Sequence, residues 1–349
     1  MKLGLNLGYW GLGNDADNLA LAQEADRLGY AVVWAAEAYG SDSPTVLAWL
    51  AAQTSRIDIG SAVMQIPART PAMTAMTAAT LDTLSGGRFR LGLGVSGPQV
   101  SEGWHGVRFA KPLARTREYV DIIRLALSRE RVRYQGSTYI LPLPGGPGKA
   151  LQLTVHPIRA HIPIYLAAVG PKNLELAGEI ADGWLSVFFA PQFAAELLEP
   201  IAAGRARTGK TLDGFDVVPT VPLVIGEDLD SCIAQVRGYA ALYVGGMGSR
   251  EQNFYNDLAV RMGYPDEAAE VQSRYLGRDY AGAAAAVPAP FVDSTSLLGP
   301  PSRLADRLAE FADAGVTTLS VSTFGATLGE RMESLRIADK ALAEAGVGE

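Results

Sequence analysis

Two glycine-rich stretches of the sequence could seat an anionic or planar ligand. The first, LGLGVSG at residues 91–97, spaces its glycines as G-x-G-x-x-G, the pattern that cradles a pyrophosphate in dinucleotide-binding folds. In that fingerprint the glycines follow a strand and open a helix, with an acidic residue about 20 positions later. Here Gly92 and Gly94 lie inside the apolar run 89–95, and the PQVS that follows Gly97 does not predict a helix start. The match to a dinucleotide site is therefore weak.

The same stretch has a second interpretation, as a strand whose small residues let a flat or phosphorylated ligand approach the backbone. Such a strand would end at Ser96-Gly97, where backbone N–H groups face the ligand. A second stretch, Val169-Gly170-Pro171, passes directly into a predicted helix, whose N-terminus also favours anions. The two stretches predict adjacent anion sites. The alternative is that both sets of glycines only relieve crowding in a tightly packed barrel.

The elements that would position these stretches alternate along the whole chain. Short apolar runs are followed by segments of helical periodicity, which is typical of parallel strands with crossover helices. The predicted fold is α/β, a (β/α)8 TIM barrel that forms one domain over residues 1–349, with insertions at about 129–162 and 245–302. An open doubly wound sheet is the alternative, but its nucleotide-binding glycines normally follow the first strand. The predicted strands are 2–8, 30–37, 57–66, 88–97, 164–170, 183–188, 215–226 and 315–323.

Composition and charge disfavour several classes of partner. The 349 residues carry a net charge of −7, with 48% hydrophobic and 19% charged residues, so nucleic acid and anionic membrane surfaces are not expected partners. The single cysteine, Cys232, rules out an internal disulfide, and the N-terminal residues lack a signal-peptide pattern, which predicts a cytoplasmic location. With 3 histidines and no C-x-x-C motif, the sequence predicts no metal site.

In a (β/α)8 barrel the active site lies at the carboxyl ends of the strands, and this rule selects candidate side chains. Tyr39 and His105 are the candidates for proton transfer, each with a purely structural loop hydrogen bond as the alternative. Arg69 is expected either to hold an acidic group of a ligand or to pair with an acid of a neighbouring loop. Tyr9 and Asn14 follow the first predicted strand and are further candidates.

Aromatic residues at the same strand ends predict a largely apolar site for a small organic substrate. Trp10 and Trp104 are the expected substrate contacts among them. Core packing is an equally good explanation for Phe188. The aromatic residues that follow strands are Trp10, Tyr39, Trp104, Phe188 and Phe189.

The chain resembles the bacterial-luciferase-like (β/α)8 oxidoreductases, and within them the coenzyme F420-dependent branch. The combination of SGGRFRLGLGVSG with GP-x-N-x3-AGEIADG is specific to this superfamily, and further matches lie in LGLNLGYW, ADRLGYAVVWAAEAYGSD and YVGGMGSREQNFYNDLAVRMGY. The resemblance implies a homodimeric enzyme that moves a hydride between C5 of the deazaflavin F420 and an organic substrate. Two alternatives stay open: an FMN-dependent monooxygenase of the same fold, and a non-redox barrel protein that binds a phosphorylated metabolite.

The resemblance also implies the cofactor-binding residues. A non-prolyl cis peptide bond is expected at about Ala62-Val63, with Gln65 near the polar edge of the cofactor ring and Glu37 near the polar part of the cofactor. The cofactor phosphate is expected at the two glycine stretches and at the residues beside them. That predicted phosphate site consists of Ser96, Gly97, Ser101, Glu102, Val169, Gly170, Lys172 and Asn173.

One departure from the family bears on the substrate. Relatives that oxidise glucose 6-phosphate carry a histidine directly after the acid and a glutamate in the loop after the fourth strand. This chain has Ala38 and Pro98 at those positions, so that activity is not expected.

Overall fold

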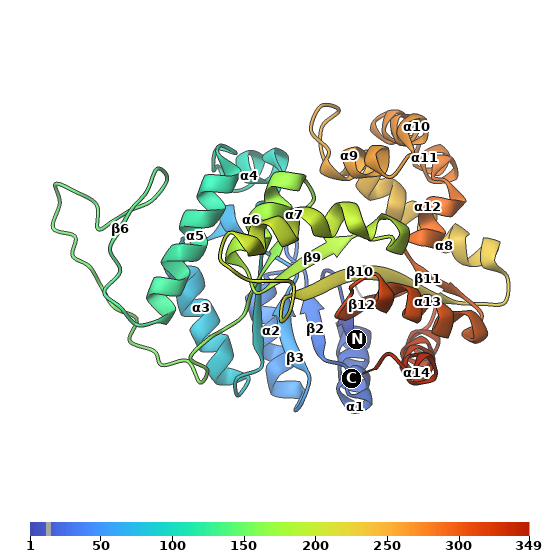
Figure 1. Cartoon of the computed structure of the whole chain (residues 1–349), viewed down its shortest axis with the longest axis horizontal. Coiled ribbons are helices and arrows are strands. Elements are labelled where there is room, and N and C mark those ends of the chain that lie inside the picture. Colours follow the sequence, from blue (N-terminus) through green and yellow to red (C-terminus); the bar gives the residue numbers. More distant parts are fainter. Residues whose placement is uncertain (12–14, 349) are drawn as a thin grey trace.

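A computed structural model describes residues 1–11 and 15–348 (Figure 1). Its strands form a closed parallel ring, because β1 pairs with both β2 and β12, and β10 pairs with both β9 and β12. The closed ring confirms the predicted (β/α)8 barrel and excludes the open doubly wound sheet. The ring strands are β1 (Lys2–Asn6), β2 (Val32–Ala35), β3 (Asp58–Ser61), β5 (Phe89–Gly94), β8 (Ile164–Ala167), β9 (Gly183–Val187), β10 (Asp216–Ile225) and β12 (Thr318–Thr323).

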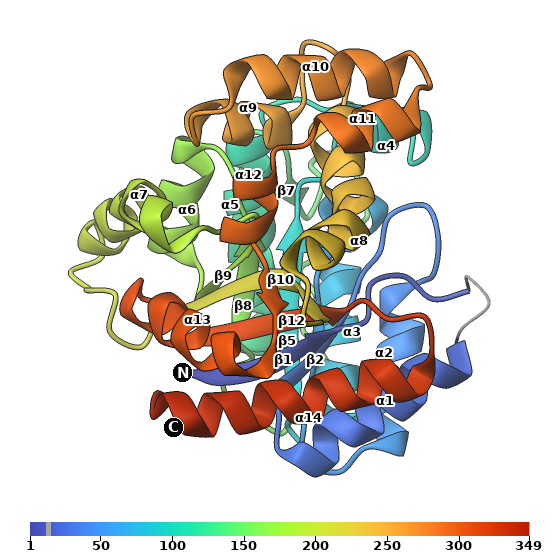
Figure 2. The ribbon, with the colours of Figure 1, turned by 90° about the vertical axis from the view of Figure 1, so that its right-hand side faces the viewer.

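Helices surround this ring on its outer face (Figures 1 and 2). Several begin where the sequence supplies a cap: Asp42 and Thr70 accept hydrogen bonds from the first-turn N–H groups of the helices that follow them. The outer helices are α1 (Asp15–Leu28), α2 (Ser43–Gln53), α3 (Pro71–Leu84), α5 (Pro112–Leu127), α6 (Pro171–Ile180), α7 (Ala194–Ala206), α13 (Pro301–Asp313) and α14 (Leu328–Ala345), with short 3-10 turns η1 (Ile66–Ala68) and η2 (Pro191–Phe193).

The barrel interior is filled by side chains that alternate along the strands. Trp34 and Tyr165 pack edge to face with ring centroids 5.4 Å apart, inside a buried cluster that also holds Leu185. Near the amino ends of the strands, Arg90 Nε donates to Asp58 Oδ2 at 2.8 Å, and Arg90 Nη1 lies 3.2 Å from Asp216 Oδ2. The interior is therefore a packed core, and a ligand must bind at one of its ends.

The glycines of β5 make room for the protein's own chain. A Cβ atom on Gly92 would lie 1.9 Å from the carbonyl oxygen of Ser61, and one on Gly94 would lie 2.5 Å from Val63 Cγ2. These contacts come from the last residue of β3 and from the segment after it, where the Ala62–Val63 peptide bond is cis and a short strand β4 (Met64–Gln65) resumes the pairing with β5. The expectation that these two glycines let a ligand approach was therefore wrong; they relieve crowding.

A further expectation was wrong at the end of β5. The sequence PQVS did not predict a helix start, but residues Pro98–Gly103 form helix α4, with Gly97 at its N-cap. Ser96 takes a left-handed backbone with φ 61°, which turns the chain sharply from strand to helix. Proline is well suited to the first helical turn because that turn leaves its N–H groups without helical partners.

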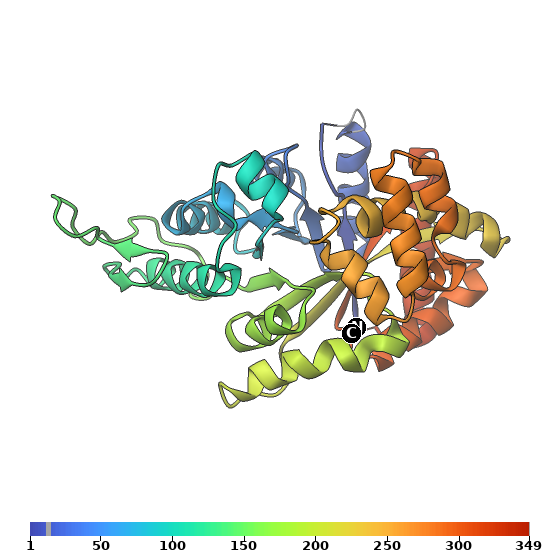
Figure 3. The same ribbon diagram turned by 90° about the horizontal axis from the view of Figure 1, so that it is seen from above.

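Two long excursions leave the barrel. The first carries a small antiparallel pair, β6 (Tyr134–Gln135) and β7 (Ile140–Leu141), and extends to one side of the molecule (Figures 1 and 3). The second follows helix α8 (Leu229–Ala241) and lies on the other side (Figure 3). It contains η3 (Leu242–Gly246), α9 (Phe254–Arg261), α10 (Pro265–Leu276), α11 (Tyr280–Ala286), α12 (Ala289–Ser294) and a strand β11 (Leu297–Gly299), which pairs with β10 and was not predicted.

Among the described residues, no helix is both long and apolar enough to cross a membrane.

Candidate functional site

The carboxyl ends of the barrel strands lead to the end of the molecule where α4 and helices α9 to α11 lie (Figure 2). The predicted site residues that the structure describes fall on the loops and helices at this mouth and, for Gln65, on the short strand β4. Asn14, also predicted there, lies outside the described residues.

Over β2 and β3, an arginine and a glutamate form a bidentate ion pair. Arg69 Nη1 and Nη2 donate to the two carboxylate oxygens of Glu37 at 2.6 and 2.9 Å, and Arg69 also pairs with Asp42. The Glu37 side chain is 7% exposed and accepts two further bonds, from the backbone N–H groups of Ser43 and Gln65. Of the two expectations for Arg69, the structure shows the pairing with loop acids.

Gln65 connects this ion pair to His105. Gln65 Nε2 donates to the backbone carbonyl of Glu37 at 2.9 Å, and Gln65 Oε1 lies 3.1 Å from His105 Nε2. A carbonyl can only accept, so the amide nitrogen must face Glu37 and the amide oxygen must face the histidine. His105 Nε2 therefore carries a proton, and in the neutral ring the free lone pair is on Nδ1.

We call Arg69, Glu37, Gln65 and His105 the polar chain. The sequence named all four at the mouth but assigned them separately, with Glu37 and Gln65 as cofactor contacts. The structure brings them together, and most of their polar atoms form hydrogen bonds to one another. Within the described residues, the Glu37 carboxylate and the Gln65 amide are thus already engaged by protein groups.

The residues after β5 hold a loop in place. The Ser101 hydroxyl donates to the carbonyl of Val107 at 2.7 Å, and Glu102 accepts from the backbone N–H of Phe109 at 3.0 Å. Both residues were predicted to close over a cofactor phosphate. Trp104, in the same loop, is 67% exposed, so its ring is free to meet a ligand.

The loop after β8 lies next to the large insertion. Gly170 is the N-cap of α6 and offers no side chain to cap it, while the exposed Lys172 lies in the first turn. Asn173 bonds through its backbone N–H to the carbonyl of Gly170 at 3.0 Å. Arg261 of α9 donates to the carbonyl of Val169 at 2.9 Å. The sequence analysis did not identify Arg261, because the strand-end rule says nothing about where a long insertion returns.

The predicted aromatic residues separate into rim and core. Tyr39 is 71% exposed, whereas Trp10 is 7% exposed and packs edge to face on Trp49, with ring centroids 5.5 Å apart. Phe189 is fully buried against Trp184 and Phe311. The structure thus places Trp10 and Phe189 in the core.

Phe188 lies at the centre of a group of tyrosines, of which the sequence analysis identified only Tyr9. We call Tyr9, Tyr239, Tyr243 and Tyr255 the tyrosine cluster; Phe188 contacts the last three, with ring centroids 5.8, 5.6 and 6.2 Å away. Burial, with neighbouring phenols, raises the pKa of Tyr9 and of Tyr255 to about 12 and raises those of Tyr239 and Tyr243 as well. The four-residue spacing of Tyr239 and Tyr243 on one helical face was the available signal.

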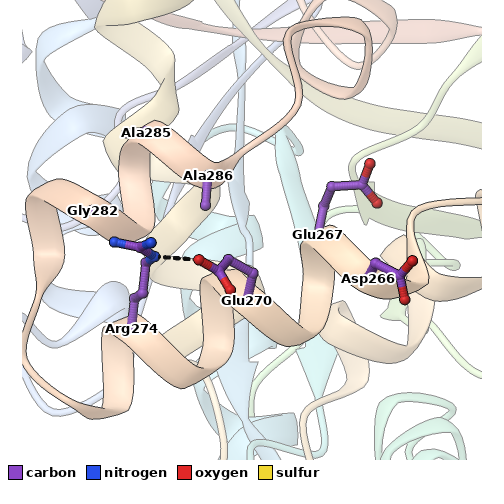
Figure 4. A pocket seen from close by; sticks show the side chains of 7 residues that line it. All are labelled: Asp266, Glu267, Glu270, Arg274, Gly282, Ala285 and Ala286. Atoms are coloured by element: carbon purple, nitrogen blue, oxygen red, sulfur yellow. Dashed lines mark hydrogen bonds and ion pairs between the residues drawn. The ribbon is translucent and has the colours of Figure 1, made fainter.

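A separate hollow lies on the outside of the insertion, between α10 and α11 (Figure 4). Arg274 pairs there with Glu270 at 2.6 Å, and none of the predicted site residues lines it. We therefore do not assign the predicted site to this hollow. Among the described residues there is also no group of three or more histidine, cysteine, aspartate or glutamate side chains that could hold a metal ion.

Comparison with known proteins gives a consistent picture. The family model for luciferase-like monooxygenases matches residues 11–318. A Mycobacterium tuberculosis protein that is named as a coenzyme F420-dependent oxidoreductase is 46% identical over 329 residues, which cover 92% of this chain and 95% of that protein. The 5,10-methylenetetrahydromethanopterin reductase of Archaeoglobus fulgidus is 31% identical over 84% of this chain and 85% of its own.

The fold agrees with these matches. The solved structure of the coenzyme F420-dependent tetrahydromethanopterin reductase from Methanopyrus kandleri superimposes with a TM-score of 0.83 and 25% identity, over 98% of each chain. Since the family model matches most of the sequence, and since relatives above 30% identity span nearly the whole chain, the protein is a member of the luciferase-like monooxygenase family.

Proposed function

We propose that this protein is a coenzyme F420-dependent oxidoreductase that moves a hydride between C5 of the deazaflavin and a small organic substrate. The observation that carries the proposal is the 46% identity, over 92% of the chain, to a relative named for that cofactor. When bound, the deazaflavin supplies hydride exchange at C5. The protein then has to bind the cofactor, orient it at the mouth and manage protons there.

The residues after β8 fit the phosphate of such a cofactor. The N-terminus of α6 has no side-chain cap, and Lys172 and Arg261 add positive charge beside it. A helix N-terminus flanked by cations stabilises an anion. We assign two groups of residues to the phosphate. The loop after β8 supplies Val169, Gly170, Lys172 and Asn173, and the loop after the neighbouring strand β5 supplies Ser96 and Gly97. Ser101 and Glu102 then act by holding the β5 loop.

The segment after β3 fits the support of the cofactor ring. Ala62 and Val63 are fixed from below by β5, since Val63 fills the space above Gly94. Gln65 and Glu37 are bonded into the polar chain, and their role in the proposal is to keep this segment and His105 in position. His105 Nδ1 is then the atom that can accept or return a proton, with the exposed Tyr39 as a second proton-transfer candidate.

The family also supports an alternative, an FMN-dependent monooxygenase, since the matching family model is named for monooxygenases. The experiment that separates the two is parallel titration of the purified protein with coenzyme F420 and with FMN, followed by fluorescence. Binding of F420 with at least tenfold preference supports the proposal. Preference for FMN overturns it in favour of oxygen chemistry. Binding of neither favours the third candidate, a barrel protein for a phosphorylated metabolite.

A matched pair of lysine variants tests the phosphate assignment. Lys172→Gln removes a charge in the first turn of α6 and is expected to weaken F420 binding about fivefold, the effect of roughly 1 kcal/mol. Lys210→Gln removes an exposed charge on the far side of the barrel, before β10, and is expected to leave binding unchanged. Equal effects of the two variants contradict the assignment.

We also propose that the protein is a cytoplasmic homodimer of single-domain subunits, each comprising residues 1–349 with insertions at about 129–162 and 245–302. The support for the dimer is an apolar face on α3, where Met73, Met76 and Leu84 are exposed, continued by the exposed Ile158 of the first excursion. The excursion is tied to that helix, because Thr83 Oγ1 donates to the carbonyl of His156 and Arg159 pairs with Asp82. Sedimentation of the wild type and of Met76→Glu tests it: a dimer that the substitution dissociates is expected.

A further inference from the structure

We propose that the tyrosine cluster binds the substrate, and that it selects a neutral molecule with an aromatic ring and a carbonyl oxygen. The inference rests on the proposed function in one respect only, namely that the reaction takes place at this mouth. It adds the chemical class of the substrate, which the family and the cofactor do not determine.

The cluster lies over one half of the mouth. Tyr9 follows β1, Phe188 follows β9, Phe324 follows β12, and Tyr239 and Tyr243 lie on the helical segment that follows β10. These four strands are consecutive neighbours in the ring. The polar chain and the proposed phosphate loops lie over the other half, after β2, β3, β5 and β8. A substrate on the cluster would therefore face a cofactor held by the opposite half.

Rings line this half at contact distances. Tyr239 and Tyr243 have centroids 4.8 Å apart, Tyr243 and Tyr255 are 4.9 Å apart at 81°, and Tyr239 meets Phe324 edge to face at 5.9 Å. The residues of the cluster are partly exposed. Partly exposed aromatic rings of this kind attract another ring through edge-to-face and offset contacts as well as through burial of apolar area.

The hydroxyl groups of the cluster are short of protein partners. Among the described residues, those of Tyr9 and Tyr255 have no hydrogen-bond partner, and those of Tyr239 and Tyr243 have only each other. A phenol can donate one hydrogen bond and accept others, so this half of the mouth presents unused donors. A carbonyl oxygen is the matching acceptor.

The third selected feature of the substrate is that it carries no charge. The groups that act electrostatically on these hydroxyls are other tyrosines: Tyr243 and Tyr39 on Tyr9, and Tyr9 on Tyr255. The cluster stays neutral, because burial holds the pKa values of its phenols above the ordinary value. Moving an anion from water onto neutral phenols, without a cation to pair with it, is costly. A carboxylate is therefore expected to bind worse than a ketone of the same shape.

The test compares three probes by calorimetry on the purified full-length protein, with and without bound F420: 2-acetonaphthone, 2-naphthoate and cyclohexyl methyl ketone. The aryl ketone is expected to bind at least tenfold more tightly than either of the other two, since each lacks one of the selected features. Equal affinity for the carboxylate, or for the ring-free ketone, overturns the proposal.

Matched tyrosine variants locate the binding. Tyr243→Phe and Tyr255→Phe keep the rings and remove the hydroxyls, and each is expected to weaken binding of 2-acetonaphthone about fivefold. Tyr280→Phe makes the same change on an exposed ring of α11, outside the cluster, and is expected to have no effect. Unchanged affinity in the two cluster variants overturns the proposal, and thermal melting of all three variants verifies that they are folded.

The outcomes separate this inference from the proposed function. The cluster variants are expected to bind F420 as the wild type does, because the phosphate loops lie on the other half of the mouth. Tyrosine-dependent binding of the aryl ketone by a protein that does not bind F420 would retain this inference and refute the cofactor. Binding of F420 without selective binding of the aryl ketone would support the cofactor and refute this inference.

Discussion

Over β2, β3 and β5 the polar side chains of the mouth are bonded to one another, whereas over β9, β10, β12 and β1 the phenols are largely without protein partners. A buried charge must be paired to be tolerated, so the first arrangement is a requirement of folding. A partly exposed phenol can be satisfied by water, so the second is compatible with folding without any protein partner. The difference separates a half that holds its own shape from a half that is available to a ligand.

The largest effect is expected where the bonded half is broken. Arg69→Met leaves the carboxylate of Glu37 buried without its bidentate partner and should lower the free energy of unfolding by about 3–5 kcal/mol. Arg108→Met breaks an arginine–glutamate pair too, but there both side chains are exposed, at 80% and 39%, so a loss below about 0.5 kcal/mol is expected. Urea unfolding at pH 7 measures the loss of stability in both variants. Equal losses would contradict the distinction between the buried and the exposed ion pair.

At alkaline pH the phenols of the tyrosine cluster are expected to contribute to a loss of stability. The pKa of Tyr9 and of Tyr255 is raised from 10.0 to about 12, chiefly by burial, so the folded state holds these protons more tightly than the unfolded state. The contribution of these two phenols to the free energy of unfolding is fully present below about pH 10 and is lost as the pH rises toward 12. Absorbance at 295 nm should show a late group of phenols in the folded protein, and in urea all phenols should titrate near pH 10. Tyr255→Phe should remove one equivalent from the late group.

A smaller effect is expected at the end of the polar chain. Gln65→Leu removes the acceptor that favours a proton on His105 Nε2, so the neutral tautomer ratio should shift toward Nδ1–H by about fivefold, the value of one hydrogen bond. Long-range nitrogen–proton NMR on 15N-histidine protein reports the tautomer directly. His161, whose Nε2 lies 3.0 Å from Asp182 Oδ1, is the internal control and should not change. A wild-type His105 protonated on Nδ1 alone would refute the assignment.

The sequence predicted the residues in the half of the mouth over β2, β3 and β5, where short loops follow the strands. Glu37, Gln65 and Arg69 lie within a few residues of strand ends, where the barrel rule places functional side chains, and His105 lies in the loop that follows β5 and α4; all four were identified. Their mutual bonds were not predicted, with the partial exception of Arg69, because side-chain pairing depends on how neighbouring loops meet. Gly92 and Gly94 show the same limit: their spacing was visible, but the neighbours that require them, the end of β3 and the segment after it, were not.

The other half escaped prediction for a different reason. Tyr239, Tyr243 and Tyr255 belong to α8, η3 and α9, and only the three-dimensional path of this long excursion brings them beside Tyr9 and Phe188. Likewise α4 was missed because its six residues are too few to show helical periodicity, and β11 because a three-residue strand carries no alternation. Phe188 was noted at a strand end, but its left-handed backbone and its central contacts follow from packing.

The most direct comparison of the two halves removes one hydroxyl group from each. Tyr119→Phe removes a buried hydroxyl that donates to the carbonyl of Arg69 at 3.1 Å and lies 2.5 Å from Thr74 Oγ1, so unfolding should become easier by about 1–2 kcal/mol. Tyr255→Phe removes a hydroxyl without a partner among the described residues, and its effect should stay within about 0.5 kcal/mol. Urea unfolding of the two variants in the same buffer decides the matter. If Tyr255→Phe cost as much as Tyr119→Phe, its hydroxyl would be serving the fold and would not be available to a carbonyl ligand.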